Sequence, residues 1–299
     1  MTLRTLCMNI RTVRKKIKSI KNVKKITKAM QMVSAVKMRK AQLLEVEGRP
    51  YRDGLTEMIA TLSKKIDPSF SKILQVDTSG AKRELLVVVS SNKGLAGSFN
   101  VSLFRHLLSL YPSFKNVDIV TVGSKGTQFF SRLKDATIIA DFSGGNLILE
   151  ASALFDYLLE QYSTGKYTSV SISYNQFVST LRSDQVKKTL LPLSILDEEA
   201  ESNKDKEQNL KGFDLIIEPS AAEILEELLK SFLEYTIRGA IISSEAVEHS
   251  MRMMAMKSAT DNAVEIIYQM TLLANRLRQE KITNELLDMI TAKESVESN

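Results

Sequence analysis

The sequence predicts an α/β protein in which a mainly parallel sheet domain is inserted between two long helices that form an antiparallel coiled coil. Two observations support this fold class. Both ends of the chain, residues 9–44 and 222–290, carry apolar side chains at coiled-coil spacing. The middle alternates short apolar segments with helix-like segments, which is typical of a parallel sheet. The expected division is an N-terminal coiled-coil helix (1–66), a central α/β domain (67–218) and a C-terminal coiled-coil helix (219–299).

The N-terminal helix has no Gly or Pro between Thr2 and Glu47. Its apolar residues first follow heptad spacing, then slip by one position, which would change the supercoil locally. The first stripe is Leu6, Ile10, Val13, Ile17 and Ile20, and the second is Val23, Ile26, Met30 and Val33. We expect Gly48–Pro50 to bend or interrupt the helix before it continues to about residue 66.

The C-terminal helix has a more regular stripe, with alternating steps of three and four residues. Only His249 and Thr260 are polar interruptions of this otherwise apolar stripe. The sustained 3.5-residue period predicts a left-handed supercoil. The stripe comprises Leu225, Leu228, Phe232, Tyr235, Gly239, Ile242, Ala246, His249, Met253, Met256, Thr260, Ala263, Ile267, Met270, Ala274 and Leu277.

The central domain reads as an open, Rossmann-like sheet. Expected strands cover residues 84–91, 117–122, 136–140, 168–177, 186–192 and 213–217, and expected helices cover 101–111, 126–133 and 147–162. Residues 197–208 form a charged stretch that we interpret as an exposed loop.

Composition limits the possible classes of protein. An apolar fraction of 43% and a charged fraction of 25% are those of a soluble globular protein. No apolar run approaches the roughly 20 residues of a membrane span, and no secretory signal is expected. The single cysteine, Cys7, indicates a reducing compartment. With two histidines and one cysteine, we expect no His/Cys metal site. We also expect no cofactor, because no phosphate-binding motif in the sequence is complete.

Charge is distributed unevenly along the chain. Residues 1–44 contain 13 Lys/Arg and no Asp/Glu, while the remainder holds 28 basic against 35 acidic residues. The basic helix could be a solvated face, bind nucleic acid, or resemble a transit peptide. Nucleic-acid binding is the alternative function, although no aromatic residue precedes Tyr51 to stack on bases.

Two glycine-containing segments follow expected strands, where α/β proteins often bind phosphate. SNKGLAGSFN (91–100) and GSKGT (123–127) lack the spacing of a dinucleotide fingerprint or a P-loop, so we interpret both as structural turns. His106 and His249 cannot be arranged into a catalytic triad order. An α/β enzyme with a coiled-coil dimerisation arm is therefore disfavoured, and we expect no catalytic residues.

The two helices carry more specific motifs. Residues 10–42 (IRTVRKKIKSIKNVKKITKAMQMVSAVKMRKAQ) closely resemble the N-terminal helix of the gamma subunit of F-type ATP synthase. Residues 244–261 (SEAVEHSMRMMAMKSATD) and 278–288 (RQEKITNELLD) resemble the C-terminal helix of that family, and SNKGLAGSFN resembles its central segment. The resemblance spans nearly the whole chain in the same order. Asn92, Ala96, Thr291 and Lys293 depart from the family pattern, and the paired cysteines of chloroplast members are absent.

The resemblance implies a non-catalytic rotor that forms the central stalk of the proton-translocating enzyme. Its implied partners are three alpha and three beta subunits, the epsilon subunit and the ring of c subunits, without nucleic acid. Active sites are expected on beta. Membrane contact would be indirect, at the cytoplasmic face of a bacterial cell membrane.

The resemblance also implies which residues touch these partners. Lys28 and Met30 match family positions that face a moving loop of beta. Rotor–stator contacts are likewise implied for Arg252, Gln279, Thr283 and Glu285, and a contact on the side of the membrane ring is implied for Glu218.

Overall fold

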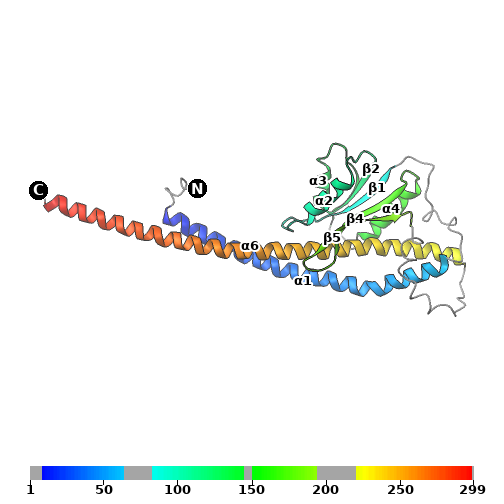
Figure 1. The fold of residues 1–299 in the computed structure, drawn as a ribbon, viewed down its shortest axis with the longest axis horizontal. Helices are drawn as coiled ribbons and strands as arrows, with labels where there is room; N and C mark the ends of the chain where they lie inside the picture. Colours follow the sequence, from blue (N-terminus) through cyan, green and yellow to red (C-terminus); the bar gives the residue numbers. More distant parts are fainter. Residues whose placement is uncertain (1–8, 64–82, 145–149, 194–219, 298–299) are drawn as a thin grey trace. The chain divides into compact units, whose positions relative to one another are not determined.

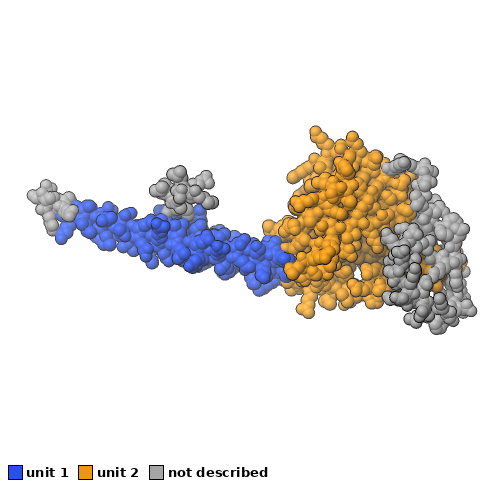
Figure 2. Space-filling model, in the orientation of Figure 1, with its two compact units in different colours: residues 1–34, 252–299 blue, residues 35–251 orange. Residues whose placement is uncertain are grey.

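The computed structural model describes residues 9–63, 83–144, 150–193 and 220–297 (Figure 1). The chain divides into two compact units, which Figure 2 shows in different colours. Unit 1 comprises residues 1–34 and 252–299, and unit 2 comprises residues 35–251. Two long helices, α1 (Ile10–Ser63) and α6 (Ala221–Glu297), each contribute a segment to both units.

Unit 2 contains a five-stranded sheet with the strand order β3-β2-β1-β4-β5 (Figure 1). Parallel pairing joins β1 to β2, β1 to β4, and β2 to β3. β5 is antiparallel to β4, because a tight turn at residues 178–182 connects the two strands. The predicted mainly parallel sheet is confirmed. The strands are β1 (Glu84–Val89), β2 (Val117–Val122), β3 (Thr137–Phe142), β4 (Ser169–Phe177) and β5 (Ser183–Leu191).

Both faces of the sheet are buried, which explains why β1 is a continuous apolar run. Successive side chains of a strand point to opposite faces. Leu86 and Val88 therefore pack in one cluster, with residues of α2 (Phe99–Leu110) and α3 (Ser124–Phe130). Leu85 and Val87 lie in the other cluster, with residues of α4 (Ala151–Ser163), α1 and α6.

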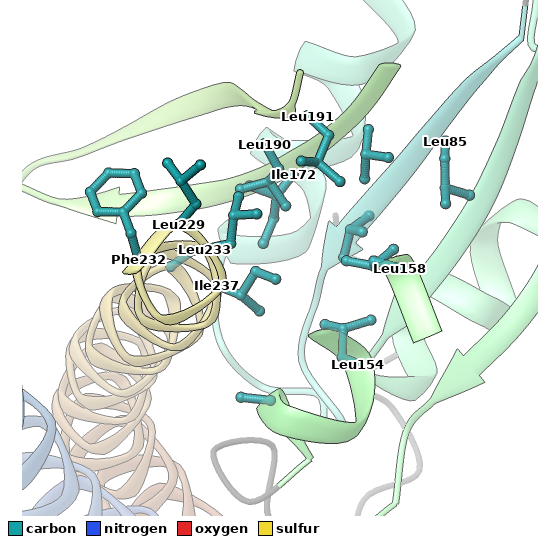
Figure 3. Close-up of a cluster of buried hydrophobic side chains, with 14 of the residues drawn as sticks. Leu85, Leu154, Leu158, Ile172, Leu190, Leu191, Leu229, Phe232, Leu233 and Ile237 are labelled. Carbon is teal, nitrogen blue, oxygen red and sulfur yellow. The ribbon is translucent and has the colours of Figure 1, made fainter. Parts of the chain in front are cut away.

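The second cluster joins the long helices to the sheet, as Figure 3 shows. Leu229, Leu233 and Ile237 of α6 are at most 1% exposed and pack in the same cluster as Leu154 and Leu158 of α4. Residues of α1 complete the cluster: Leu55, Ile59 and Leu62. In unit 2, both long helices are therefore part of the core of the sheet domain.

Helix α1 continues from Ile10 to Ser63 through Pro50, so Gly48–Pro50 does not interrupt it. A proline inside a helix costs roughly 3 kcal/mol. The side chains beyond the proline offset this cost, because Leu55 and Ile59 are 5% and 1% exposed. Burial of one such side chain contributes roughly 1.5–3 kcal/mol. The packing of the helix thus outweighs the local preference of its sequence.

Other expected elements agree closely with the structure or fall outside it. β2 covers the predicted residues 117–122, and α6 extends the predicted helix 222–290 at both ends. The expected charged loop (197–208), the expected strand (213–217), Cys7 and Glu218 lie outside the described residues.

Candidate functional site: the paired helices

In unit 1, the two long helices bury a regular stripe of α6. The predicted three-and-four spacing is confirmed in this segment, and it is the pattern of a coiled-coil seam. Met256, Thr260 and Ala263 are buried, and the following stripe residues are half-buried: Ile267, Met270, Ala274 and Leu277.

The opposing stripe of α1 does not slip as predicted. Val13 is fully buried, and the seam continues in the same register through Thr27 and Ser34, which are 8% and 3% exposed. Ile17 and Ile20, between these positions, are half-buried. The expected second stripe is wrong as a seam, because its aliphatic residues face solvent: Val23, Ile26 and Val33 are 48%, 58% and 57% exposed.

A hydrogen bond between two threonine hydroxyls crosses the seam. Thr27 Oγ1 and Thr260 Oγ1 lie 2.8 Å apart, and both residues are buried. Thr260 Oγ1 also lies 2.7 Å from the carbonyl oxygen of Met256, and Thr27 Oγ1 lies 3.1 Å from that of Lys24. Sequence reasoning did not identify Thr27; the available signal was Thr260, a polar residue at a seam position of α6.

The exposed face of α1 combines aliphatic and basic side chains. We call Val23, Ile26 and Val33 the aliphatic stripe. Exposed lysines lie beside it, including Lys25 and Lys28, and α1 has no acidic residue before Glu45. An apolar surface rimmed by positive charge favours a partner that offers apolar contacts and acidic groups.

A segment of α6 after the seam is exposed on all sides. Every residue from 278 to 293 is exposed. Large apolar side chains lie in this segment, 49–62% exposed: Ile282, Leu286, Leu287, Met289 and Ile290. Contiguous exposed apolar surface of this kind marks sites of interaction with other proteins.

The structure places the expected contact residues of α1 in two different environments. Lys28 is exposed, and its Nζ donates a hydrogen bond to Gln31 Oε1 over 3.3 Å. Met30 is half-buried. On α6, Arg252 is 7% exposed and therefore offers little surface to a partner in this conformation.

The other expected contact residues lie together on the exposed end of α6. Gln279 and Thr283 occupy successive turns, and Thr283 Oγ1 donates a hydrogen bond to the carbonyl oxygen of Gln279 over 3.0 Å. Glu285 Oε1 pairs with Lys281 Nζ over 3.3 Å. All three expected residues are exposed, whereas Glu218 lies outside the described residues.

His249 belongs to the interior of unit 2 and is 7% exposed. Its Nε2 lies 3.4 Å from Glu245 Oε1. The hydrogen bond from His249 lowers the pKa of Glu245 against the opposing effect of burial, and Lys37 and Lys40 of α1 lower it further. Lys37 and Lys40 of α1 therefore interact electrostatically with Glu245 of α6.

The two glycine-containing segments, residues 91–100 and 123–127, are hydrogen-bonded to each other at the carboxyl ends of β1 and β2. Ser124 donates its backbone N–H to Asn92 Oδ1 over 3.0 Å, and Ser124 Oγ donates to the carbonyl oxygen of Asn92 over 2.9 Å. Gly123 has φ +101°, and a Cβ there would lie 2.1 Å from the carbonyl oxygen of Ser90. These contacts explain both segments as structural turns.

Two further features concern the chemistry of the described residues. None of them form a group of three or more His, Cys, Asp or Glu side chains placed to hold a metal ion. Within the same residues, no helix combines the length and apolar character needed to cross a membrane.

Comparisons with known proteins identify the family. A family model described as ATP synthase matches residues 9–296. An ATP synthase gamma chain from Paraburkholderia phymatum is 34% identical over 287 residues, covering 94% of this chain and 97% of the relative. An ATP synthase gamma chain from Francisella tularensis is 35% identical over 302 residues, covering 96% of this chain and 99% of the relative.

Solved structures agree on the fold. A central stalk and c-ring structure of the Tetrahymena thermophila mitochondrial ATP synthase matches with a TM-score of 0.56 and 25% identity, covering 78% of this chain and 99% of that one. A Euglena gracilis mitochondrial ATP synthase chain matches with a TM-score of 0.61 and 20% identity, covering 96% and 94%. Because the family model and relatives at 34–35% identity extend over almost the whole sequence, this chain belongs to the gamma chain family of ATP synthase.

Proposed function

We propose that this gamma chain is the central-stalk rotor of an F-type ATP synthase. It couples ion flow through the ring of c subunits to conformational change in the catalytic beta subunits. The main observation that supports this function is the outward-facing surface of unit 1, in a chain that belongs to the gamma chain family. There, aliphatic and basic side chains of α1 face outward, beside a seam that contains small and polar side chains as well as apolar ones.

A rotor surface must meet several partner surfaces in turn, so its contacts need to be adaptable. Aliphatic side chains make non-directional contacts, and a uniformly basic face attracts acidic groups in many orientations. α1 supplies both properties between residues 10 and 44, where it has no acidic side chain. The three alpha and three beta subunits are the partners that this surface suits.

The gamma chain contributes no nucleotide chemistry in this proposal. The segments that could have bound phosphate are occupied by their mutual hydrogen bonds, as between Asn92 and Ser124. ATP is made and hydrolysed on the beta subunits, and gamma biases their conformations through differential contact. The epsilon subunit and the c ring complete the rotor, so membrane contact is indirect.

We assign rotor–stator contacts to the residues that the family resemblance indicates. Gln279, Thr283 and Glu285 are supported by their exposure on one segment of α6, and Lys28 by its exposure on α1. Met30 and Arg252 offer less surface and would contact a partner with only part of the side chain. Glu218 is assigned to the side of the membrane ring on the resemblance alone.

The organisation and location of the chain follow the same proposal. The parts are the N-terminal helix (1–66), the central domain (67–218) and the C-terminal helix (219–299). The assembled stalk belongs to a membrane-associated enzyme, and we place it on the cytoplasmic face of a bacterial cell membrane.

Charge reversal on α1 tests the rotor function. The variant Lys28→Glu removes one positive charge from the exposed basic face and adds a negative one. In the reconstituted complex, we expect less ion pumping per ATP hydrolysed, with a stronger dependence on salt. The matched control is Lys134→Glu, which reverses an exposed lysine in the sheet domain.

Co-purification distinguishes the rotor from the nucleic-acid alternative, which the family comparisons do not support. Recovery of alpha and beta subunits with this chain in a fixed ratio is expected. Salt-sensitive binding to DNA or RNA, without recovery of those subunits, would reject the rotor function.

A further inference from the structure

The turn that joins β4 to β5 is fastened to α6 by two serine hydroxyls. We call residues 177–182, the last residue of β4 and the turn itself, the hairpin end. Ser243 Oγ accepts a hydrogen bond from the backbone N–H of Phe177 over 2.8 Å, and Ser250 Oγ donates one to the carbonyl oxygen of Thr180 over 2.6 Å. The two serines are one heptad apart, so they lie on the same side of α6.

Apolar burial contributes little to this attachment. Residues 178–182 are all exposed, and Leu181 is 81% exposed. Phe177 is half-buried and packs beside Ile242 and Val247 of α6. The helix itself is held in the main core of the sheet domain by several fully buried side chains. The two hydrogen bonds are therefore a large part of what holds the hairpin end, although they are a small part of what holds α6.

The hydroxyls of these serines serve the hairpin end and not the helix. Serine forms helices less readily than alanine, so α6 gains no stability of its own from serine at these positions. The neighbouring Ser244 provides a contrast. It is 1% exposed, and its hydroxyl has no hydrogen-bond partner among the described residues. Burial of a hydroxyl on this part of α6 is thus separate from attachment of the hairpin end.

We propose that Ser243 and Ser250 form a latch that fastens the hairpin end to α6, and that this latch opens and closes as one unit while the core of the sheet domain stays folded. Segments with few buried apolar contacts and exposed backbone open locally, at a free energy below that of global unfolding. The hairpin end has both features. The sheet domain therefore holds α6 through a permanent core and, beside it, a releasable attachment.

The mechanical role of the latch rests on the proposed rotor function. Ser250 directly precedes Met251, the final residue of unit 2 on α6, and the helix continues beyond it into unit 1. A twist of α6 against the sheet domain would load the contacts at this end of unit 2. Because the hairpin end is held mainly by two hydrogen bonds, it should open under such a load before the apolar core yields.

Hydrogen exchange at the backbone amide of Phe177 in the full-length chain tests the latch. The decisive variant is Ser250→Ala, because it removes the bond to Thr180 and leaves the bond between Phe177 and Ser243 in place. If the latch opens as one unit, exchange at Phe177 becomes about fivefold faster, which corresponds to about 1 kcal/mol. The matched control is Ser244→Ala, which makes the same change in helix propensity without removing a bond to the hairpin end. Phe177 should then exchange at the parent rate.

Low concentrations of urea show whether the opening is local. In the parent chain, exchange at Phe177 should not depend on urea, whereas exchange at the Val87 amide of the central strand β1 should accelerate with it. The same urea dependence at both amides would mean that Phe177 exchanges only by global unfolding. Unchanged exchange at Phe177 in Ser250→Ala would mean that the two hydrogen bonds act independently. Either result overturns the proposal, as would equal acceleration in Ser244→Ala.

The assembled complex tests the mechanical role. Exchange at Phe177 is measured in the idle complex and during ATP hydrolysis against an ion gradient, and we expect it to be faster in the working complex. Equal rates would overturn the mechanical role while leaving the latch established. Co-purification and the Lys28→Glu experiment test the rotor function without involving either serine, so failure of the latch and failure of the rotor function can be distinguished.

Discussion

The same two helices are packed by different means in the two units. In unit 2, α6 buries Leu229 and Leu233 in the core of the sheet domain. In unit 1, the seam between α1 and α6 includes small and polar side chains such as Thr27, Thr260 and Ala263 beside its apolar ones, and further aliphatic side chains face outward. The difference indicates that unit 2 uses its apolar residues for stability, whereas unit 1 presents many of them to other proteins.

This contrast has a physical cost that the assembled enzyme can offset. An exposed aliphatic side chain forgoes roughly 1.5–3 kcal/mol of possible burial. Contact with partner subunits would bury part of that surface and contribute to association. The helices of unit 1 are therefore expected to be less stable in the isolated chain than in the complex.

The largest expected effect contrasts two leucines on α6. Leu229→Ala removes a fully buried side chain of the unit 2 core and should lower the free energy of unfolding by about 2–5 kcal/mol. Leu272→Ala makes the same change in unit 1, where the side chain is 53% exposed, and should change it by less than about 0.5 kcal/mol. Urea titration of the full-length variants measures both. Equal losses would contradict the contrast between the units.

A smaller effect is expected for Asp118, a buried carboxylate on β2 that is paired with Arg83 and Lys166. Burial alone would raise the pKa of Asp118, but hydrogen bonds from Tyr167, Lys166 and Arg83 together hold it below 3.8. This pairing therefore stabilises the fold above the unfolded pKa, and the contribution is lost as the pH falls through the lower folded value. Asp118→Asn should cost roughly 2 kcal/mol at pH 7.

The pH dependence is the sharper measurement for this residue. The difference in thermal midpoint between the parent and Asp118→Asn should narrow as the pH falls below about 4, because the parent then loses the same charge. The matched control is Asp184→Asn, whose pair with Arg182 is exposed. Exposed pairs contribute about 0–1 kcal/mol, so this control should remain near the parent. A constant difference at all pH values would show that the charge of Asp118 is not responsible.

The sequence predicted best where the local pattern agrees with burial in the fold. Four of the six residues of β2 are aliphatic, the strand lies between β1 and β3, and the predicted range 117–122 is the observed one. The stripe from Met256 to Leu277 was also predicted, because its period is regular and its buried face is mostly apolar. In both cases, local pattern and tertiary burial favour the same arrangement.

Prediction failed where α1 offers two competing patterns. Val23, Ile26 and Val33 form the more apolar stripe in their segment, so hydrophobicity indicated them as the seam. The structure instead keeps the register set by Val13 and places Thr27 opposite Thr260. A hydrogen bond between residues so distant in sequence leaves no local signal. The contact residues of the proposed stator interface depend on partner chains, and the sequence indicates them only through family resemblance.

The smallest expected effect on stability is that of a truncation at the exposed end of α6. Deleting residues 283–299 removes Leu286, Leu287, Met289 and Ile290, which are 50–62% exposed. Little burial is lost, so the thermal transition of the sheet domain should be unchanged in calorimetry of the truncated chain. A deletion from residue 268 is the matched comparison, because it also removes the half-buried seam residues Met270, Ala274 and Leu277. Hydrogen exchange in residues 10–34 of α1 should then be faster for the longer deletion alone. If the shorter deletion accelerated that exchange equally, the exposed end of α6 would be contributing to the seam. Its apolar side chains would then not be available for contact with the alpha and beta subunits.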